Sequence, residues 1–164
     1  MSSRGFSLVE MITVVATVSL LIALGTLMFQ RYDRSFRAEA QTRLILAELM
    51  KARMNAITQH RGTRVKLYRD RFEVYSSASE RREGVDPIMV QSLNFPITKN
   101  FSGAAEEVEV DFKETGFTDS WGSICVDIEG TQPALNSIVI SATSIRSGVK
   151  EMANDCVSPN ITFK

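Results

Sequence analysis

Residues 4–10 read Arg-Gly-Phe-Ser-Leu-Val-Glu, and the next nineteen, Met11–Phe29, contain no Asp, Glu, Lys or Arg. At 1.5 Å per residue, a helix of about 20 such residues crosses a bilayer core of about 30 Å. A secretory signal peptide has a shorter apolar run of about 7–15 residues, with a small-residue cleavage site after it. Here the small residue, Gly5, precedes the run, and Glu10 lies at its start, where an unpaired charge costs at least about 2.5 kcal/mol. The stretch therefore predicts a membrane helix rather than a signal peptide.

The helix is expected to continue beyond the apolar run. No Pro or Gly occurs between Gly25 and Gly62, and good helix formers dominate the interval. Apolar residues recur every three or four positions, at Phe36, Ala40, Leu44, Ala47, Met50, Met54 and Ile57. We expect this stripe to pack on a sheet, and one helix to run from Phe6 to about His60, with Gly62 as its left-handed cap.

Strand patterns follow the helix. Residues alternate with the strand period in 63–68 and 71–75, and Arg69-Asp70 forms a tight turn between them. Further strands are expected at 88–93, 108–112, 123–128 and 137–143, separated by Gly- and Pro-containing turns, and residues 76–86 are expected to form a mobile loop. A long helix followed by many short strands predicts an α+β fold, with the helix packed on antiparallel sheet.

Opposite charges gather in different parts of the chain beyond the apolar run. Residues 31–82 contain 13 Lys or Arg and 6 Asp or Glu, whereas residues 83–164 contain 5 and 12. This asymmetry suggests head-to-tail complementarity between subunits, or two solvated faces. The basic stretch consists of Arg61, Arg64, Lys66, Arg69 and Arg71. It would suit nucleic-acid phosphates, the solvent face of a hairpin, or the acidic part of another subunit, and we do not expect nucleic acid to be a partner.

No pattern in the sequence indicates an enzyme, a cofactor or a metal. There is no phosphate-binding Gly-rich loop and no nucleophile elbow, and the lone histidine, His60, suits a helix end better than a general base. Glu107, Glu109 and Asp111 would share one face of a strand and could hold Ca²⁺. A solvated strand face is the simpler interpretation, because no Gly-turned Asp or Asn loop accompanies them. Trp121, at a turn, is expected to be a core or edge aromatic, with partner binding as the alternative.

Residues 4–10 and the apolar run resemble the class III leader of type IV pilins and type II secretion pseudopilins. In that family a membrane peptidase cuts after the Gly and methylates the new amine. The resemblance implies cleavage between Gly5 and Phe6, methylation of Phe6, and a role in assembly for Glu10, the fifth mature residue. A Glu10 carboxylate and the Phe6 amine of a neighbouring subunit would offset each other's burial cost. An ordinary signal anchor with an accidental Glu is the alternative.

A narrower resemblance links the chain to the GspH/FimT-like family, which comprises the H-type minor pseudopilin of type II secretion and a related minor type IV pilin. Residues 49–57 with Gly62 and 65–67 resemble its helix-to-first-strand signature, and residues 108–116 and 137–141 resemble its later strands. Members fold as a long N-terminal helix packed on antiparallel sheets. The resemblance is strong over residues 4–67 and loose beyond.

This sequence departs from the wider family at two places. Leu27 stands where major pilins carry a helix-kinking Pro, so we expect a straighter helix. The Gly-Arg-x-Arg element near the end of the DNA-binding minor pilin is absent, and the corresponding stretch, residues 144–150, reads Ser-Ile-Arg-Ser-Gly-Val-Lys.

The two cysteines, Cys125 and Cys156, are expected to pair. A leader that exports the domain places them in an oxidising compartment, where a disulfide is the usual outcome. The bond would attach the C-terminal tail to the strand containing Cys125. A pair of buried thiols is the alternative, and their spacing does not suit a metal site.

Together these features predict a minor pseudopilin of a type II secretion system. Residues 1–5 form a cleaved leader, 6–29 a filament-core helix, 30–60 its amphipathic continuation, and 61–164 a β-rich periplasmic domain anchored in the bacterial inner membrane. The expected partners are other pseudopilins or pilins, the prepilin peptidase and the inner-membrane assembly platform. A minor type IV pilin that primes pilus assembly or DNA uptake, and an anchored periplasmic domain that never polymerises, are the alternatives.

Overall fold

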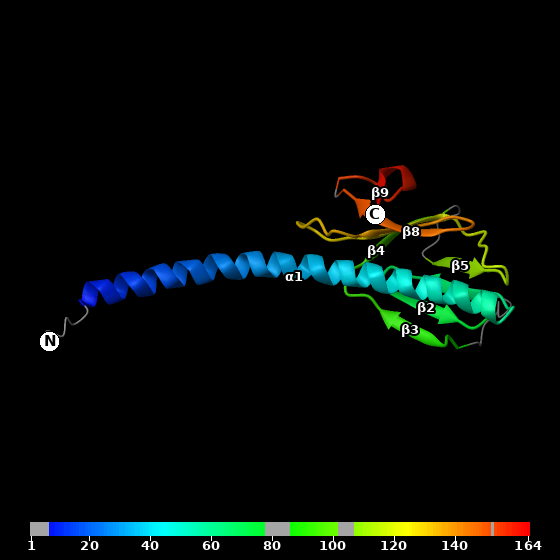
Figure 1. Cartoon of the computed structure of the whole chain (residues 1–164), viewed down its shortest axis with the longest axis horizontal. Helices are drawn as coiled ribbons and strands as arrows, with labels where there is room; N and C mark the ends of the chain where they lie inside the picture. The colour runs from blue at the N-terminus through cyan, green and yellow to red at the C-terminus, as the bar shows by residue number, and fades with distance from the viewer. Residues whose placement is uncertain (1–6, 78–85, 102–106, 152) are drawn as a thin grey trace. The chain divides into compact units, whose positions relative to one another are not determined.

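The computed structural model describes residues 7–77, 86–101, 107–151 and 153–164, without the side chain of Leu27. The chain divides into two compact units, Met1–Arg34 and Ser35–Lys164. The helix α1, Leu8–Thr58, belongs partly to each (Figure 1). The expected helix start at Phe6, the leader and most of the expected loop 76–86 lie outside the described residues.

In the first unit, α1 is an exposed apolar helix. Its side chains from Leu8 to Thr26 are solvent-exposed, and it is long and apolar enough to cross a membrane. The hydroxyls of Thr13, Thr17 and Ser19 donate to backbone carbonyls three or four residues earlier. These bonds satisfy the polar groups of the segment locally, which an apolar environment requires.

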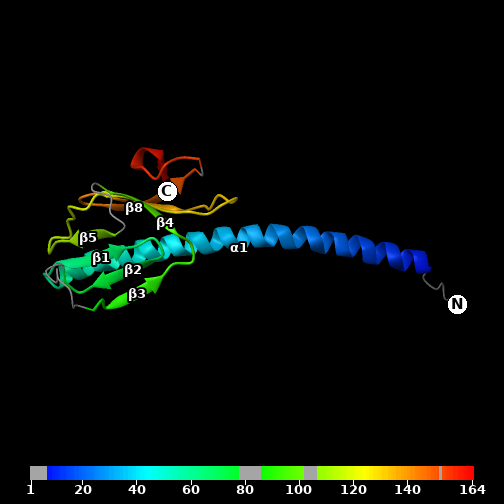
Figure 2. The ribbon, with the colours of Figure 1, turned by 180° about the vertical axis from the view of Figure 1, so that it is seen from behind.

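The second unit contains two antiparallel sheets beside the remainder of α1, as Figures 1 and 2 show. Sheet A has the order β3-β2-β1-β5, and sheet B has the order β4-β6-β7-β8-β9. The strands of sheet A are β1 (Thr63–Leu67), β2 (Arg71–Tyr75), β3 (Met89–Ser92) and β5 (Val108–Phe112). Those of sheet B are β4 (Ile97–Phe101), β6 (Gly122–Val126), β7 (Ser137–Ile140), β8 (Ile145–Lys150) and β9 (Ile161–Phe163), with the 3₁₀ turn η1 (Ser158–Asn160) before β9. The α+β fold predicted from the sequence is therefore confirmed.

Three strands, β4, β8 and β9, were not predicted from the sequence. Pro96 precedes β4 immediately and marks a turn in the sequence, yet proline is tolerated just ahead of a strand. β8 contains Gly148, which weakens a strand pattern. The structure explains this glycine, because a Cβ there would lie 2.5 Å from the Ile161 side chain on β9. Gly148 thus permits β9 to pair closely with β8.

One core joins α1 to both sheets, but it uses a different face of α1 from the one that the sequence predicted. The buried positions of the helix include Ala38, Thr42, Ile45, Leu49, Ala52 and Ala56. The predicted stripe is exposed, with Phe36 at 61% and Met54 at 59%. At about 100° per residue the two faces lie on opposite sides of the helix. The core takes the face with three alanines because small side chains let the helix backbone approach the sheets closely.

The helix also ends differently from the prediction. α1 ends at Thr58, and His60 rather than Gly62 adopts the left-handed conformation, with φ 48°. The Arg61 N–H donates to the Ala56 carbonyl at 3.2 Å, and the His60 N–H to the Ile57 carbonyl at 3.4 Å. These two bonds form a Schellman motif with His60 at the position that glycine usually occupies. His60 is therefore a helix-capping residue.

Candidate functional site

The proposed processing residues Gly5 and Phe6 lie outside the described residues. Glu10 lies in the first turn of α1 and is exposed. Within the described part of the chain no side chain pairs with its carboxylate, and the positions that follow it to Phe29 carry no charge. An acidic group in the first turn interacts favourably with the helix dipole. The free energy gained in this way is small compared with the cost of burying an unpaired charge in an apolar environment.

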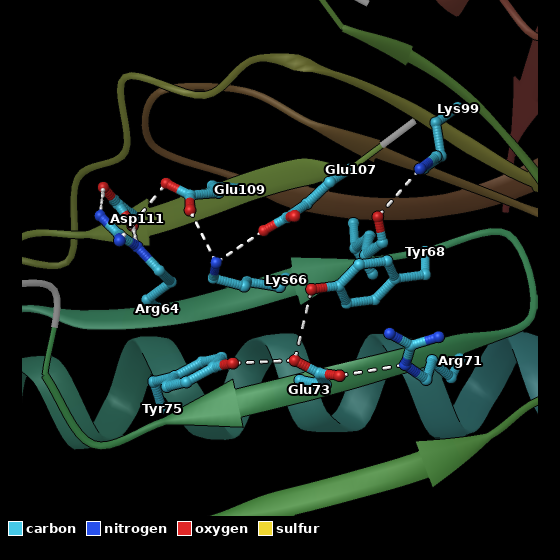
Figure 3. Close-up of polar contacts among 11 residues, drawn as sticks. Arg64, Lys66, Tyr68, Arg71, Glu73, Tyr75, Lys99, Glu107, Glu109 and Asp111 are labelled. Atoms are coloured by element: carbon cyan, nitrogen blue, oxygen red, sulfur yellow. Dashed lines mark hydrogen bonds and ion pairs between the residues drawn. The ribbon is translucent and has the colours of Figure 1, made fainter. Parts of the chain in front are cut away.

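A ladder of opposite charges connects β1 and β5 on the face of sheet A that points away from the core (Figure 3). Arg64 and Lys66 on β1 lie directly opposite Asp111 and Glu109 on β5. The Arg64 guanidinium donates from Nε to Asp111 Oδ1 at 2.6 Å and from Nη2 to Oδ2 at 2.8 Å. Lys66 Nζ lies 2.6 Å from Glu107 Oε1 and 3.1 Å from Glu109 Oε1. Cross-strand pairs of this kind hold the register of two strands.

The ladder raises the pKa of both cations. The hydrogen bond to Asp111 is the largest cause for Arg64, and the hydrogen bond to Glu107 is the largest for Lys66; burial opposes both. The Arg64 side chain is only 2% exposed, whereas that of Glu109 is 40% exposed. The buried cation is therefore matched by carboxylates that remain partly hydrated.

A second cluster surrounds Glu73 on β2 (Figure 3). Its carboxylate accepts hydrogen bonds from Tyr75 Oη at 2.8 Å and from Arg71 Nε at 3.0 Å. Burial by itself raises the pKa of Glu73, but the bonds from Tyr75 and Arg71 outweigh it and the pKa lies below its ordinary value. Burial and the bond to Glu73 raise the pKa of Tyr75 to about 12. The Arg71 guanidinium also stacks 4.0 Å from the centre of the Tyr68 ring.

These contacts change the interpretation of the charged segments. Three of the cations in the basic stretch, Arg64, Lys66 and Arg71, pair with carboxylates of the same chain. Two cations of β1, Arg64 and Lys66, thus offset part of the charge of the three carboxylates Glu107, Glu109 and Asp111, so the acidic face is not purely solvated but keeps a negative excess. The described residues include no group of His, Cys, Asp and Glu that could hold a metal ion.

Sequence reasoning missed this pairing although the signal was present. Cations alternate at positions 64 and 66, and anions alternate at 107, 109 and 111. Two strands with opposite charges at the strand period are natural neighbours, but the long separation along the chain concealed the match.

The structure contains the predicted disulfide between Cys125 on β6 and Cys156. The Ser123 hydroxyl donates to the Cys156 carbonyl at 2.6 Å, and both sulfurs lie in a small cluster with Val139 and Ile161. The bond thus attaches the segment before η1 and β9 to β6, an inner strand of sheet B. Trp121, immediately before β6, is 63% exposed and is an edge aromatic rather than a core one.

A long N-terminal helix packed on antiparallel sheets, with a disulfide near the C-terminus, is the type IV pilin-like fold. The chain is similar in structure to the type IV minor pilin FimU of Pseudomonas aeruginosa, with a TM-score of 0.51 and 15% sequence identity, over 77% of this chain and 95% of that one. No protein-family model and no curated protein matches the sequence. This similarity defines the fold.

Proposed function

We propose that this protein is a minor subunit of a type IV pilin-like filament, and specifically a minor pseudopilin of a type II secretion system. The observation that carries the proposal is Glu10, a carboxylate without a partner among the described residues, which lies ahead of a long charge-free helical segment. Such a segment anchors the subunit in the inner membrane before assembly and packs among the helices of other subunits afterwards. The globular unit then stands on the periplasmic side.

Glu10 has a physical role in this scheme. A carboxylate within an apolar helix bundle is costly alone, whereas the positive amine of a cleaved and methylated Phe6 from a neighbouring subunit offsets that cost. The ion pair would form when the incoming helix reaches the axial position that brings Glu10 beside the neighbour's Phe6 amine, and it would stabilise the helix at that position. Prepilin peptidase and the inner-membrane platform are the partners that such processing and extraction require.

A minor subunit of a type IV pilus is the second candidate function, and the similarity to the minor pilin FimU favours it. Both functions use the same leader and helix. They differ in the machine that the filament serves, so deletion of the gene separates them. Loss of exported enzymes from the medium supports the secretion subunit, and loss of surface pili or twitching supports the pilus subunit.

Processing and assembly test the proposal directly. Mass spectrometry of the membrane-bound protein should find an N-terminal methylated Phe6. Glu10→Ala should leave the protein in the membrane, because it removes a charge from an apolar helix, but should reduce its incorporation into filaments. Thr13→Ala is the matched control, since the Thr13 hydroxyl donates to backbone carbonyls of its own helix. A mature chain that keeps Met1, or unchanged incorporation of Glu10→Ala, contradicts the proposal.

A further inference from the structure

A groove lies on the face of sheet B that points away from the core. Residues paired across an antiparallel sheet share a face, and the register places Asn100 on β4, Ser123 on β6 and Val139 on β7 in one row. Ile124, the next residue on β6, belongs to the core, so the row points outward. The C-terminal segment, red in Figures 1 and 2, covers part of this face, since the Ser123 hydroxyl donates to the Cys156 carbonyl.

The part of this face that the C-terminal segment leaves open is a groove of about 520 Å³, within the range of about 300–1,000 Å³ typical of small-molecule sites. Ser158 of η1 lines one side of it. Trp121, two residues before Ser123, also lines the groove, and its side chain is 63% exposed. The other described lining residues are Asn100, Gly122, Ser123, Val139, Ile140, Ser141 and Ala142. The groove thus presents a large aromatic ring that the described part of the chain leaves largely uncovered.

The polar side chains around the ring are neutral. None of the described residues that line the groove is charged. Asn100, Ser141 and Ser158 are exposed, and their side chains make no hydrogen bond to another described residue. A serine hydroxyl and an asparagine amide can each donate and accept. The groove therefore offers donors and acceptors of both kinds beside a flat apolar surface.

This combination fits an uncharged saccharide. A pyranose ring has an apolar C–H face, which stacks on an indole ring, and a rim of hydroxyl groups that both donate and accept hydrogen bonds. An anion would find no cation among the described lining residues, and a metal ion would find no carboxylate. A wholly apolar ligand would cover the amide and hydroxyl groups without pairing them, which costs free energy.

We propose that this groove binds an uncharged oligosaccharide, with one sugar ring stacked on Trp121 and hydroxyl groups bonded to Asn100, Ser141 and Ser158. The inference concerns the globular unit alone and does not depend on the proposed filament function. A glycan with plain hydroxyl groups and one with N-acetyl groups present the same ring face and hydroxyl rim, so the experiment uses one of each.

Intrinsic fluorescence tests the proposal, because Trp121 is the only tryptophan of the chain. The full-length protein is held in a zwitterionic detergent, since alkyl glycosides carry sugar rings of their own, and is titrated with cellotetraose or with tetra-N-acetylchitotetraose. A stacked sugar ring displaces water from the indole, so the emission should shift to shorter wavelength and acrylamide should quench it less. Half-saturation is expected at about 1 mM or below. A response to either sugar supports the site, and the stronger response identifies which kind of glycan it prefers.

Two variants locate the binding. Asn100→Ala should weaken it about fivefold, the effect of about one lost hydrogen bond. Asn94→Ala, which changes an exposed asparagine outside the groove, is the matched control and should bind like the wild type. Trp121→Ala removes the fluorescent signal, so its binding is followed by saturation-transfer NMR of the sugar and should be lost. Its melting temperature should stay unchanged, because the side chain is mostly exposed.

Three results would overturn the inference. The first is an emission that neither sugar changes at concentrations well above the expected half-saturation. The second is sugar binding that persists in Trp121→Ala, or equal affinities for Asn100→Ala and Asn94→Ala. The third is a shift produced by a peptide with apolar side chains and by neither sugar, which would assign the groove to a peptide instead.

Discussion

Arg64 on β1 and Asp111 on β5 lie opposite each other and share two hydrogen bonds, in a pair whose cation is buried and whose carboxylate is 32% exposed. The basic and acidic segments of the chain thus meet within one subunit. The uneven charge distribution suggested that opposite charges pair between subunits. Part of that charge is instead paired within one subunit.

We predict that Asp111→Asn destabilises the protein by about 1–3 kcal/mol, because a buried guanidinium loses its ionised, bidentate acceptor. Partial exposure of Asp111 keeps this below the roughly 3–5 kcal/mol typical of fully buried pairs. Thermal unfolding of the detergent-solubilised chain, followed by circular dichroism, measures the change. The control is Asp70→Asn, whose 77% exposed carboxylate lies 3.6 Å from Arg71 and should contribute little. Equal melting temperatures for the two variants would contradict the prediction.

A second prediction concerns the ionisation of Tyr75. Its pKa is raised from 10.0 to about 12 by burial and by its bond to Glu73. Because the folded pKa lies above the ordinary value, the associated stability is present at lower pH and is lost as pH rises from 10 toward 12. Burial also raises the pKa of Tyr68, so tyrosinate absorbance should show late titration in the wild type, and the part of it with a midpoint of about 12 should disappear in Tyr75→Phe. Glu73→Gln should move its midpoint back toward the ordinary value; an unchanged midpoint would show that Glu73 is not involved.

The main elements of the fold followed from local patterns in the sequence. The apolar run, the absence of Pro and Gly before Gly62, and the alternation in β1, β2 and β5 each depend on neighbouring residues, so the sequence predicts them well. The pairing of β1 with β5 depends on residues more than forty positions apart, and no local pattern specifies that contact.

The choice of helix face was wrong for a related reason. Both faces of the helix satisfy the spacing rule, and the larger side chains of the Phe36–Ile57 stripe give the stronger apolar signal. The core selects the other face because Ala38, Ala52 and Ala56 allow close approach and because the Gln41 side chain bonds to the backbone of Phe95, at 2.7 Å to its carbonyl and 2.9 Å to its N–H. Such complementarity exists only once the sheets are in place.

A third prediction concerns the end of α1. His60 carries a Cβ in the left-handed region, which costs an L-residue about 1–2 kcal/mol, whereas glycine adopts it freely at some cost in chain entropy. His60→Gly should therefore stabilise the protein by about 0.5–1 kcal/mol. His60→Ala is the control, because it removes the imidazole but keeps the Cβ. If the two variants melt alike, the backbone conformation does not limit stability at this position.

A fourth prediction concerns the disulfide. The bond closes a loop between positions separated by 31 residues. Removing a disulfide that closes a loop of this length lowers the free energy of unfolding by about 3–4 kcal/mol. Cys125→Ser with Cys156→Ser should lower the melting temperature and loosen the segment around η1 and β9 first. In the oxidised wild type, thiol labelling after unfolding should find no reactive cysteine. Labelling of both without reductant would contradict the bond.

The last prediction concerns nucleic acid. Arg64, Lys66 and Arg71 pair with carboxylates of the same chain, so releasing them to phosphates would break existing ion pairs. The acidic β5 beside them also repels DNA. We therefore expect the solubilised protein to bind duplex DNA no more tightly than about 100 µM at about 0.15 M salt, the weak end of non-specific binding. Fluorescence anisotropy measures this. Glu107→Gln with Glu109→Gln should strengthen binding by removing the competing anions. Low-micromolar binding by the wild type that falls when Arg69 and Arg71 become Ala would instead favour the DNA-uptake pilin.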